Sequence, residues 1–137
     1  DIKFQFVNGE WHAYKDYVKQ DFSYTKFRKY MEYVFSYANT GSLKKQLKPI
    51  PFSTMQIGDV LVQSGSPYGH AVIVVDMCKN EKGEKQYLLA QSYMPAQETQ
   101  ILLNPNTLKP WYSQPSSSII ETPEWTFDTL DLRRWRN

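Results

Sequence analysis

The chain of 137 residues is poor in side chains that bind metals and cofactors, with one cysteine, Cys78, and two histidines, His12 and His70. A single cysteine excludes an internal disulfide. The two histidines lack the spacing of a zinc site, and the loop SGSPYGH lacks the lysine and the following helix of a phosphate-binding loop. No apolar run is long enough to span a bilayer, and no signal peptide is visible. We therefore expect no metal, no cofactor and no membrane-spanning segment.

An excess of one charge is also missing, since 16 Lys and Arg stand against 14 Asp and Glu, for a net charge of +2. This balance argues against nucleic acid or an anionic membrane as a partner. Arg133, Arg134 and Arg136 make the C-terminal end locally basic, and we interpret them as a solvated tail in preference to an anion site. Aromatic residues are abundant at 15%, which predicts an aromatic core and leaves material for an aromatic binding surface.

Hydrophobic periodicity predicts one main helix. Apolar residues recur at helical spacing from Tyr24 to Ala38, after Ser23 as a possible cap. Asn39–Gly41 is expected to end this helix, because glycine accepts the left-handed conformation of a helix stop. A short helix is expected from Ser42 to Leu47, before two prolines.

The rest of the chain favours strands. The run AVIVV is apolar on both faces, which is typical of a strand covered on each side. The expected class is α+β, with an antiparallel sheet of about five to six strands packed on one main helix, in a single domain over residues 1–137. Because a strand begins at the second residue, we expect the chain to be the C-terminal part of a longer protein. The expected strands are Ile2–Val7, Val60–Gln63, Ala71–Met77, Gln86–Ser92 and Thr99–Leu103, and a short segment from Trp125 to Leu132 is expected to pack back on the sheet.

The strongest candidate site pairs His70 with Gln91. His70 begins an apolar strand after a loop in which Gly65, Pro67 and Gly69 carry little side-chain bulk, so a substrate can approach closely. In a hairpin that turns at Asn80–Glu84, His70 and Gln91 lie at the same end of their strands. A glutamine can orient an imidazole through a neutral hydrogen bond. The alternatives, a histidine satisfied by a backbone carbonyl and a structural glutamine, stay open.

A nucleophile is harder to find. Cys78 lies eight residues along the strand from His70, about 26 Å away at about 3.3 Å per residue, so a continuous strand excludes the pair. Ser64, Ser66 and Ser92 are near in sequence but lack the nucleophile-elbow signature. Asp59 is interpreted as a turn cap.

The run GDVLVQSGSPYGHAVIVVDM, followed by LLAQSY, resembles the second half of the CHAP and NlpC-type amidases, papain-like hydrolases of bacterial cell walls. The resemblance implies that His70 is the base and Gln91 the third residue of the triad. A longer pattern that adds SYMPAQ, NPN and PWY resembles an uncharacterised family of exported bacterial proteins over about Phe4 to Trp125. It implies a periplasmic or envelope-associated protein.

The amidases carry their cysteine at the start of a helix upstream of the histidine, where the helix dipole lowers its pKa. The helix expected at Tyr24–Ala38 contains none. The resemblance therefore implies either a nucleophile upstream of Asp1 or a non-catalytic relative, and this chain by itself is expected to be inactive.

A binding module is the alternative to a hydrolase. Tyr68, Tyr93, Trp111 and Tyr112 are candidates for an aromatic platform that binds glycan or peptide, peptidoglycan included. The competing interpretation places these rings in the core. Acyl transfer on the same scaffold is a third option.

Overall fold

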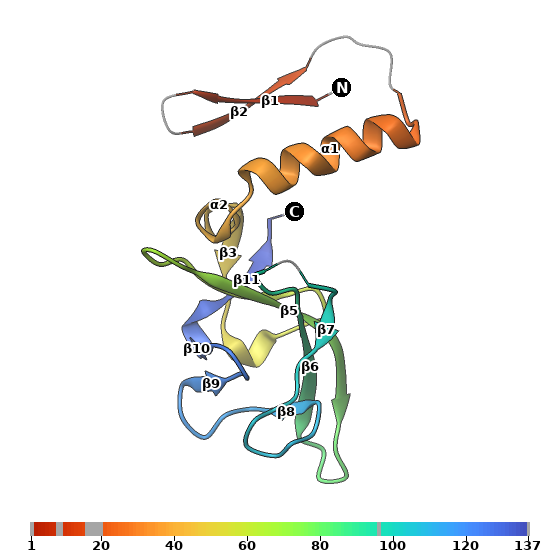
Figure 1. Cartoon of the computed structure of the whole chain (residues 1–137). Coiled ribbons are helices and arrows are strands. Elements are labelled where there is room, and N and C mark those ends of the chain that lie inside the picture. Colours follow the sequence, from red (N-terminus) through yellow and green to blue (C-terminus); the bar gives the residue numbers. More distant parts are fainter. Residues whose placement is uncertain (1, 8–9, 16–20, 96, 137) are drawn as a thin grey trace. The chain divides into compact units, whose positions relative to one another are not determined.

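The structure is a computed structural model that describes residues 2–7, 10–15, 21–95 and 97–136, with the backbone alone described before residue 21 (Figure 1). The sequence also predicts a turn at Asn8–Gly9 after the strand Ile2–Val7, and these two residues lie outside the described residues. The chain divides into two compact units, Asp1–Ala38 and Asn39–Asn137. The expectation of one domain over residues 1–137 stays a prediction.

The first unit holds a hairpin and a helix. Strands β1 (Ile2–Val7) and β2 (Glu10–Lys15) pair antiparallel. Helix α1 (Tyr24–Tyr37) begins at Ser23, whose side chain accepts a hydrogen bond from the Lys26 amide at 3.3 Å. The predicted helix and its cap are therefore confirmed. None of its residues is buried, so its aromatic side chains are not part of a core among the described residues.

Helix α1 ends at Tyr37, just before Asn39–Gly41, so the expected end of the main helix is confirmed. The second unit begins with the short helix α2 (Thr40–Gln46), which starts two residues before the expected Ser42. The Asn39 side chain accepts from the Ser42 amide at 2.9 Å, and Ser42 Oγ accepts from the Asn39 amide at 3.0 Å. This reciprocal capping box makes Asn39 the N-cap, and it explains why the short helix begins earlier than predicted. Helix α2 contacts the strands β3 (Leu47–Pro49) and β4 (Val60–Gln63).

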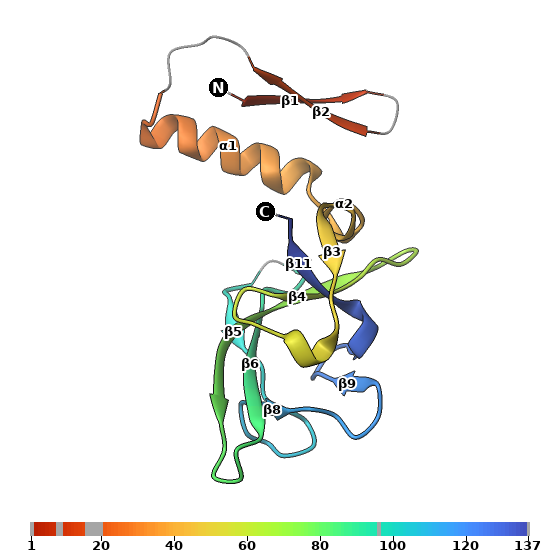
Figure 2. The same ribbon diagram turned by 180° about the vertical axis from the view of Figure 1, so that it is seen from behind.

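The second unit is built on a seven-stranded antiparallel sheet (Figure 2). Its order is β3-β11-β4-β5-β6-β7, and β8 also pairs with β6. The α+β class is confirmed, with one strand more than the upper expectation. The strands of the sheet are β3 (Leu47–Pro49), β4 (Val60–Gln63), β5 (His70–Lys79), β6 (Lys85–Gln91), β7 (Gln100–Ile101), β8 (Trp111–Ser113) and β11 (Leu132–Trp135).

A second hairpin pairs β9 (Ile119–Glu121) with β10 (Thr126–Asp128). Two 3₁₀ turns, η1 (Phe52–Thr54) and η2 (Thr129–Asp131), complete the second unit. The chain after Trp125 returns to the sheet as predicted, because η2 leads into β11, which pairs with both β3 and β4. No helix among the described residues is long and apolar enough to cross a membrane.

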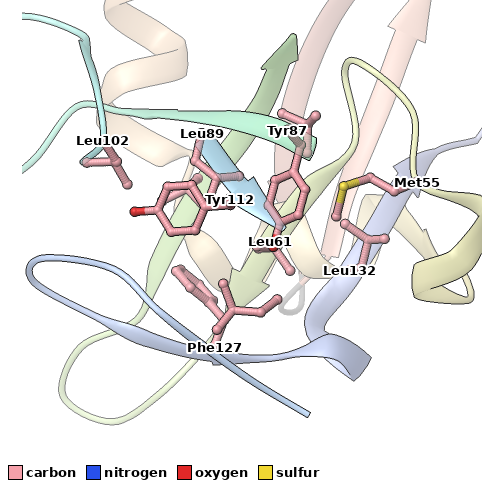
Figure 3. Close-up of a cluster of buried hydrophobic side chains, with 11 residues drawn as sticks. Met55, Leu61, Tyr87, Leu89, Leu102, Tyr112, Phe127 and Leu132 are labelled. Atoms are coloured by element: carbon pink, nitrogen blue, oxygen red, sulfur yellow. The ribbon is translucent and has the colours of Figure 1, made fainter. Parts of the chain in front are cut away.

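The main core lies on one face of the sheet, under the β9–β10 hairpin. Figure 3 shows Tyr87 and Tyr112 side by side in this core, and their ring centroids are 5.7 Å apart. Phe127 of β10 belongs to the same cluster and is fully buried. The labelled members also include Met55, Leu61, Leu89, Leu102 and Leu132.

The other face of the sheet is only partly covered. Leu47, Val60 and Val62 form a small cluster there. Further along, Ile73 is 38% and Val75 36% exposed, while their neighbours on the first face are buried. The prediction that AVIVV is covered on both sides is therefore wrong for the described residues, because β5 alternates between a buried and an exposed face.

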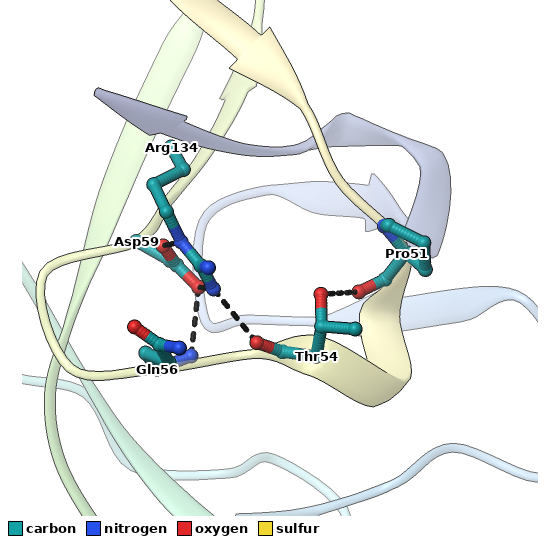
Figure 4. Close-up of polar contacts among 5 residues, drawn as sticks. All are labelled: Pro51, Thr54, Gln56, Asp59 and Arg134. Carbon is teal, nitrogen blue, oxygen red and sulfur yellow. Dashed lines mark hydrogen bonds and ion pairs between the residues drawn. The ribbon is translucent and has the colours of Figure 1, made fainter. Parts of the chain in front are cut away.

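The basic C-terminal end is not a plain solvated tail. Arg134 lies in β11 and forms an ion pair with Asp59, 2.7 Å from Nε to Oδ1 (Figure 4). Asp59 also accepts from the Gln56 amide at 2.7 Å. The turn-capping role predicted for Asp59 is confirmed, and the interpretation of Arg134 as solvated tail is wrong because β11 is a strand of the sheet.

Candidate functional site

His70 is the first residue of β5 and faces the main core. It is 8% exposed and stands opposite Gln63 of β4 in the register. The preceding residue, Gly69, has no room for a side chain. A Cβ at this position would collide with the Gln63 carbonyl oxygen and with Thr40 Oγ1. The pattern Gly-His therefore follows from crowding at the start of the strand.

His70 and Gln91 are in direct contact. The distance from His70 Nε2 to Gln91 Oε1 is 2.6 Å. Gln91 ends β6, next to Ala90, which pairs with Ile73 of β5, so the two side chains are diagonal neighbours on one face. The proximity predicted from the hairpin is confirmed.

Glu124, which no pattern in the sequence indicates, binds the other end of the Gln91 amide. Gln91 Nε2 donates to Glu124 Oε2 at 2.7 Å. A carboxylate only accepts, so the amide nitrogen faces Glu124 and the amide oxygen faces His70. Nε2 of a neutral His70 then carries the proton, and Nδ1 carries the lone pair. The contact joins residues 33 positions apart, and no spacing pattern signals it.

The free nitrogen of His70 is not sealed off from solvent. Nδ1 has no hydrogen-bond partner among the described residues. Among those residues, the only fully buried side-chain nitrogen or oxygen without a partner is Nε of Arg133. Nδ1 therefore retains solvent access, in keeping with the 8% exposure of the residue. A basic nitrogen with one open side can exchange a proton with a group that approaches it.

Three aromatic rings pack around the His70 imidazole. Its centroid lies 5.0 Å from that of Tyr93, 5.6 Å from Trp125 and 6.0 Å from Phe127. Trp125 and Phe127 were not predicted as part of the site. These rings fix the plane of the imidazole and displace water from its faces.

Trp125 is itself held by a second glutamine relay. Its indole Nε1 donates to Gln63 Oε1 at 2.9 Å, and Gln63 Nε2 donates to Asp131 Oδ2 at 2.6 Å. The neighbouring residues Glu124 and Trp125 are thus bound by glutamines from β6 and β4, the two strands that flank β5. The turn Thr122–Trp125 is therefore held beside His70 by hydrogen bonds to the two neighbouring strands, β4 and β6.

The four aromatics of the predicted platform are placed differently from one another. Tyr68 is 77% exposed on the loop before His70, and Tyr93 is half-buried against the imidazole. Trp111 is half-buried in β8. Tyr112 is 3% exposed, stacks on Tyr87 and points into the core. No ring contact joins any two of the four among the described residues.

Cys78 lies away from the His70–Gln91 contact. Strand β5 is continuous from His70 to Lys79, with a bulge at Val74/Asp76, and Cys78 is paired with Gln86 near its far end. This meets the condition under which Cys78 was excluded as the nucleophile. No group of three or more His, Cys, Asp or Glu side chains that suits a metal ion occurs among the described residues.

The family described as Domain of unknown function (4846) matches residues 2–134. The chain belongs to this family. Searches of curated proteins and of solved structures found no match. Membership in Domain of unknown function (4846) confirms the sequence-based expectation of an uncharacterised family and covers both units of the chain.

Proposed function

We propose that His70 is the general base of a cysteine hydrolase that cleaves amide bonds, with the cysteine supplied by a segment outside this chain. The observation that carries the proposal is the 2.6 Å contact from His70 Nε2 to Gln91 Oε1, with the amide held by Glu124. Because Nε2 donates to Gln91, Nδ1 carries the lone pair of the His70 imidazole, on the side of the ring that retains solvent access. The order Gly-Asp, Gly-His and Gln, and its likeness to the papain-like amidases, point to thiol chemistry in preference to other uses of a base.

In the proposed reaction, Nδ1 accepts the thiol proton and the thiolate attacks the amide carbonyl carbon. The tetrahedral intermediate collapses as the C–N bond breaks, and the proton on Nδ1 leaves with the amine. Nδ1 then takes a proton from the water that attacks the thioester carbonyl carbon. The C–S bond breaks, Nδ1 returns the proton to the sulfur, and the carboxylic acid leaves while the thiol is restored. Gln91 keeps the ring in one orientation during these transfers.

The proposed substrate is a peptide of the bacterial cell wall, and the proposed location is the cell envelope. Both come from the resemblance to the CHAP and NlpC-type amidases. The charge of +2 is compatible with this choice, because it provides no strong steering toward a polyanion.

The test is the release of amines from peptidoglycan fragments by the full-length protein. We expect His70→Ala to lower kcat by about 10²- to 10⁴-fold, the usual contribution of a positioned base. His12→Ala is the matched control, since it removes the chain's other histidine. Full activity in His70→Ala would exclude His70 as the base.

A non-catalytic envelope module that binds glycan or peptide is the second candidate. The observation that favours it is the exposure of Tyr68 and Met94, 77% and 79%, on the two loops that adjoin His70 and Gln91. Titration with cell-wall fragments should then perturb both loops, and Tyr68→Ala should weaken binding at least about tenfold, the order of a lost stacking contact. Binding without hydrolysis by the full-length protein would favour this candidate over the hydrolase.

A further inference from the structure

We infer that Glu124 is a positioning residue that decides which nitrogen of His70 carries the proton, by fixing the amide of Gln91. The inference deepens the proposed function and rests on it in one respect, because the tautomer matters to catalysis only if His70 is the base. The tautomer itself is measurable in the absence of any activity.

Neither Gln91 nor His70 has a fixed direction by itself. A glutamine amide can turn by half a rotation and exchange its donor and acceptor ends, and a neutral imidazole can carry its proton on either nitrogen. The 2.6 Å contact between them is satisfied both ways: with Nε2–H facing the amide oxygen, or with Nε2 facing the amide N–H. A third group must therefore select one arrangement.

Glu124 is that group. Its Oε2 lies 2.7 Å from Gln91 Nε2 and can only accept. Turning the amide would place Gln91 Oε1 against a carboxylate oxygen. Gln91 is 3% exposed, so little water is present to relieve such a contact. The chosen arrangement leaves the lone pair of His70 on Nδ1, the nitrogen on the open side.

The relay from Trp125 through Gln63 to Asp131 has the same arrangement, and in it the donor and the acceptor at each end are unambiguous. The Trp125 indole only donates and the Asp131 carboxylate only accepts, so the Gln63 amide between them has one possible direction. In both relays a glutamine donates to a carboxylate and accepts from a ring nitrogen. This parallel supports the assignment at Gln91.

Other charged groups do not compete for the Gln91 amide. Asp131 is committed to Gln63. The pKa of Tyr112 is raised to about 12, by burial first and by the charge of Glu124 second, so this phenol stays neutral beside the site. Among the described residues, Glu124 makes the only contact of Gln91 with a charged side chain.

The test is the ¹⁵N NMR tautomer signature of His70, recorded at about pH 9, where an ordinary imidazole is neutral. His12→Gln and His70→Gln assign the two histidines. We expect the Nε2–H form in the native protein. Glu124→Lys replaces the accepting carboxylate by a donor and should therefore turn the Gln91 amide. We expect the ratio of the two His70 tautomers to shift toward the Nδ1–H form by at least about tenfold, the order of one hydrogen bond to a charged group.

Glu124→Gln is the rescue variant, because its amide oxygen can accept from Gln91, and it should keep the native tautomer. Glu124→Ala, which removes the acceptor without adding a donor, should give a mixture of the two His70 tautomers. Glu81→Lys makes the same charge change on an exposed residue in the turn at the far end of β5, and it should leave His70 unchanged.

Glu124 is exposed, so these variants are expected to fold, which a native-like amide spectrum verifies. An unchanged tautomer in Glu124→Lys, or an equal change in Glu81→Lys, would overturn the inference. If the tautomer responds as expected while His70→Ala keeps full hydrolase activity, the proposed function fails and the positioning role of Glu124 stands.

Discussion

Arg134 holds both carboxylate oxygens of Asp59, with Nε 2.7 Å from Oδ1 and Nη2 2.9 Å from Oδ2 (Figure 4). Nη2 also donates to the Thr54 carbonyl at 2.7 Å. The hydrogen bond from Arg134 to Asp59 raises the pKa of the guanidinium above its ordinary value. This planar, two-point contact ties β11 to the turn that precedes β4, and so places the chain's C-terminal strand beside the strand that leads to the His70 loop.

Loss of the Asp59 carboxylate should destabilise the second unit. Asp59 is almost completely buried and accepts from both Arg134 and the Gln56 amide. Asp59→Ala is expected to lower the free energy of unfolding by about 2–4 kcal/mol, because partners on two segments lose their acceptor. Urea denaturation followed by circular dichroism measures the change. Asp76→Ala, an exposed aspartate on β5, is the control and should change stability by less than about 0.5 kcal/mol.

A methyl group at Gly69 should disturb both stability and the site. The added Cβ would collide with backbone at Gln63 and with the Thr40 hydroxyl, and the backbone cannot move without shifting β4 or β5. We expect Gly69→Ala to cost about 1–3 kcal/mol in unfolding free energy and to change the chemical shifts of His70. Ser66→Ala in the same exposed loop is the matched control. Equal stability of the two variants would contradict the crowding argument.

Alkaline pH should weaken the core through Tyr112. Burial, with the charge of Glu124 as the smaller cause, raises the pKa of this phenol from 10 to about 12. The unfolded chain therefore loses its proton at lower pH than the folded protein does. The contribution of Tyr112 to the free energy of unfolding is constant below about pH 10 and falls as the pH rises from 10 toward 12.

The measurement is urea denaturation at several pH values across this window. Burial also raises the pKa of the neighbouring Tyr87, so its titration adds to the slope. Tyr112→Phe should make the slope of stability against pH shallower, while it lowers stability at neutral pH through loss of the hydrogen bond from Tyr112 Oη to the Leu103 carbonyl. An unchanged slope in Tyr112→Phe would rule out Tyr112 as a cause.

The parts of the site that sequence could predict are those set by local geometry. The contact between His70 and Gln91 follows from one hairpin, in which the turn position fixes which residues face each other. Helix α1 and its Ser23 cap follow from periodicity and from one side-chain hydrogen bond. In each case the interacting residues are close in the chain or joined by a single turn.

The missed parts depend on where distant strands meet. Glu124 reaches Gln91 across 33 residues, and Arg134 reaches Asp59 across 75. Both contacts exist because the β9–β10 hairpin covers the sheet face and β11 then enters between β3 and β4. No periodicity in the sequence encodes that entry, so the sequence predicts a solvated tail for Arg134 and gives no signal for Glu124.

The Asp131–Gln63–Trp125 relay should keep the Thr122–Trp125 turn closed over His70. Gln63→Leu leaves the indole N–H without an acceptor and removes one of the two donors to Asp131 Oδ2, the other being the Asp128 amide at 2.8 Å. We expect a loss of about 1–3 kcal/mol in unfolding free energy, together with faster amide hydrogen exchange at Thr122 and Trp125.

The control for this effect is Gln86→Leu. Gln86 is also a strand glutamine, but its amide donates to Ser113 on β8, away from the turn. Gln86→Leu should therefore leave exchange at Thr122 and Trp125 unchanged. The Thr122 amide donates to the Trp125 carbonyl at 2.8 Å, so its exchange rate reports directly on opening of the turn. If Gln63→Leu protects this amide as well as the native protein does, the relay through Gln63 does not keep the turn closed.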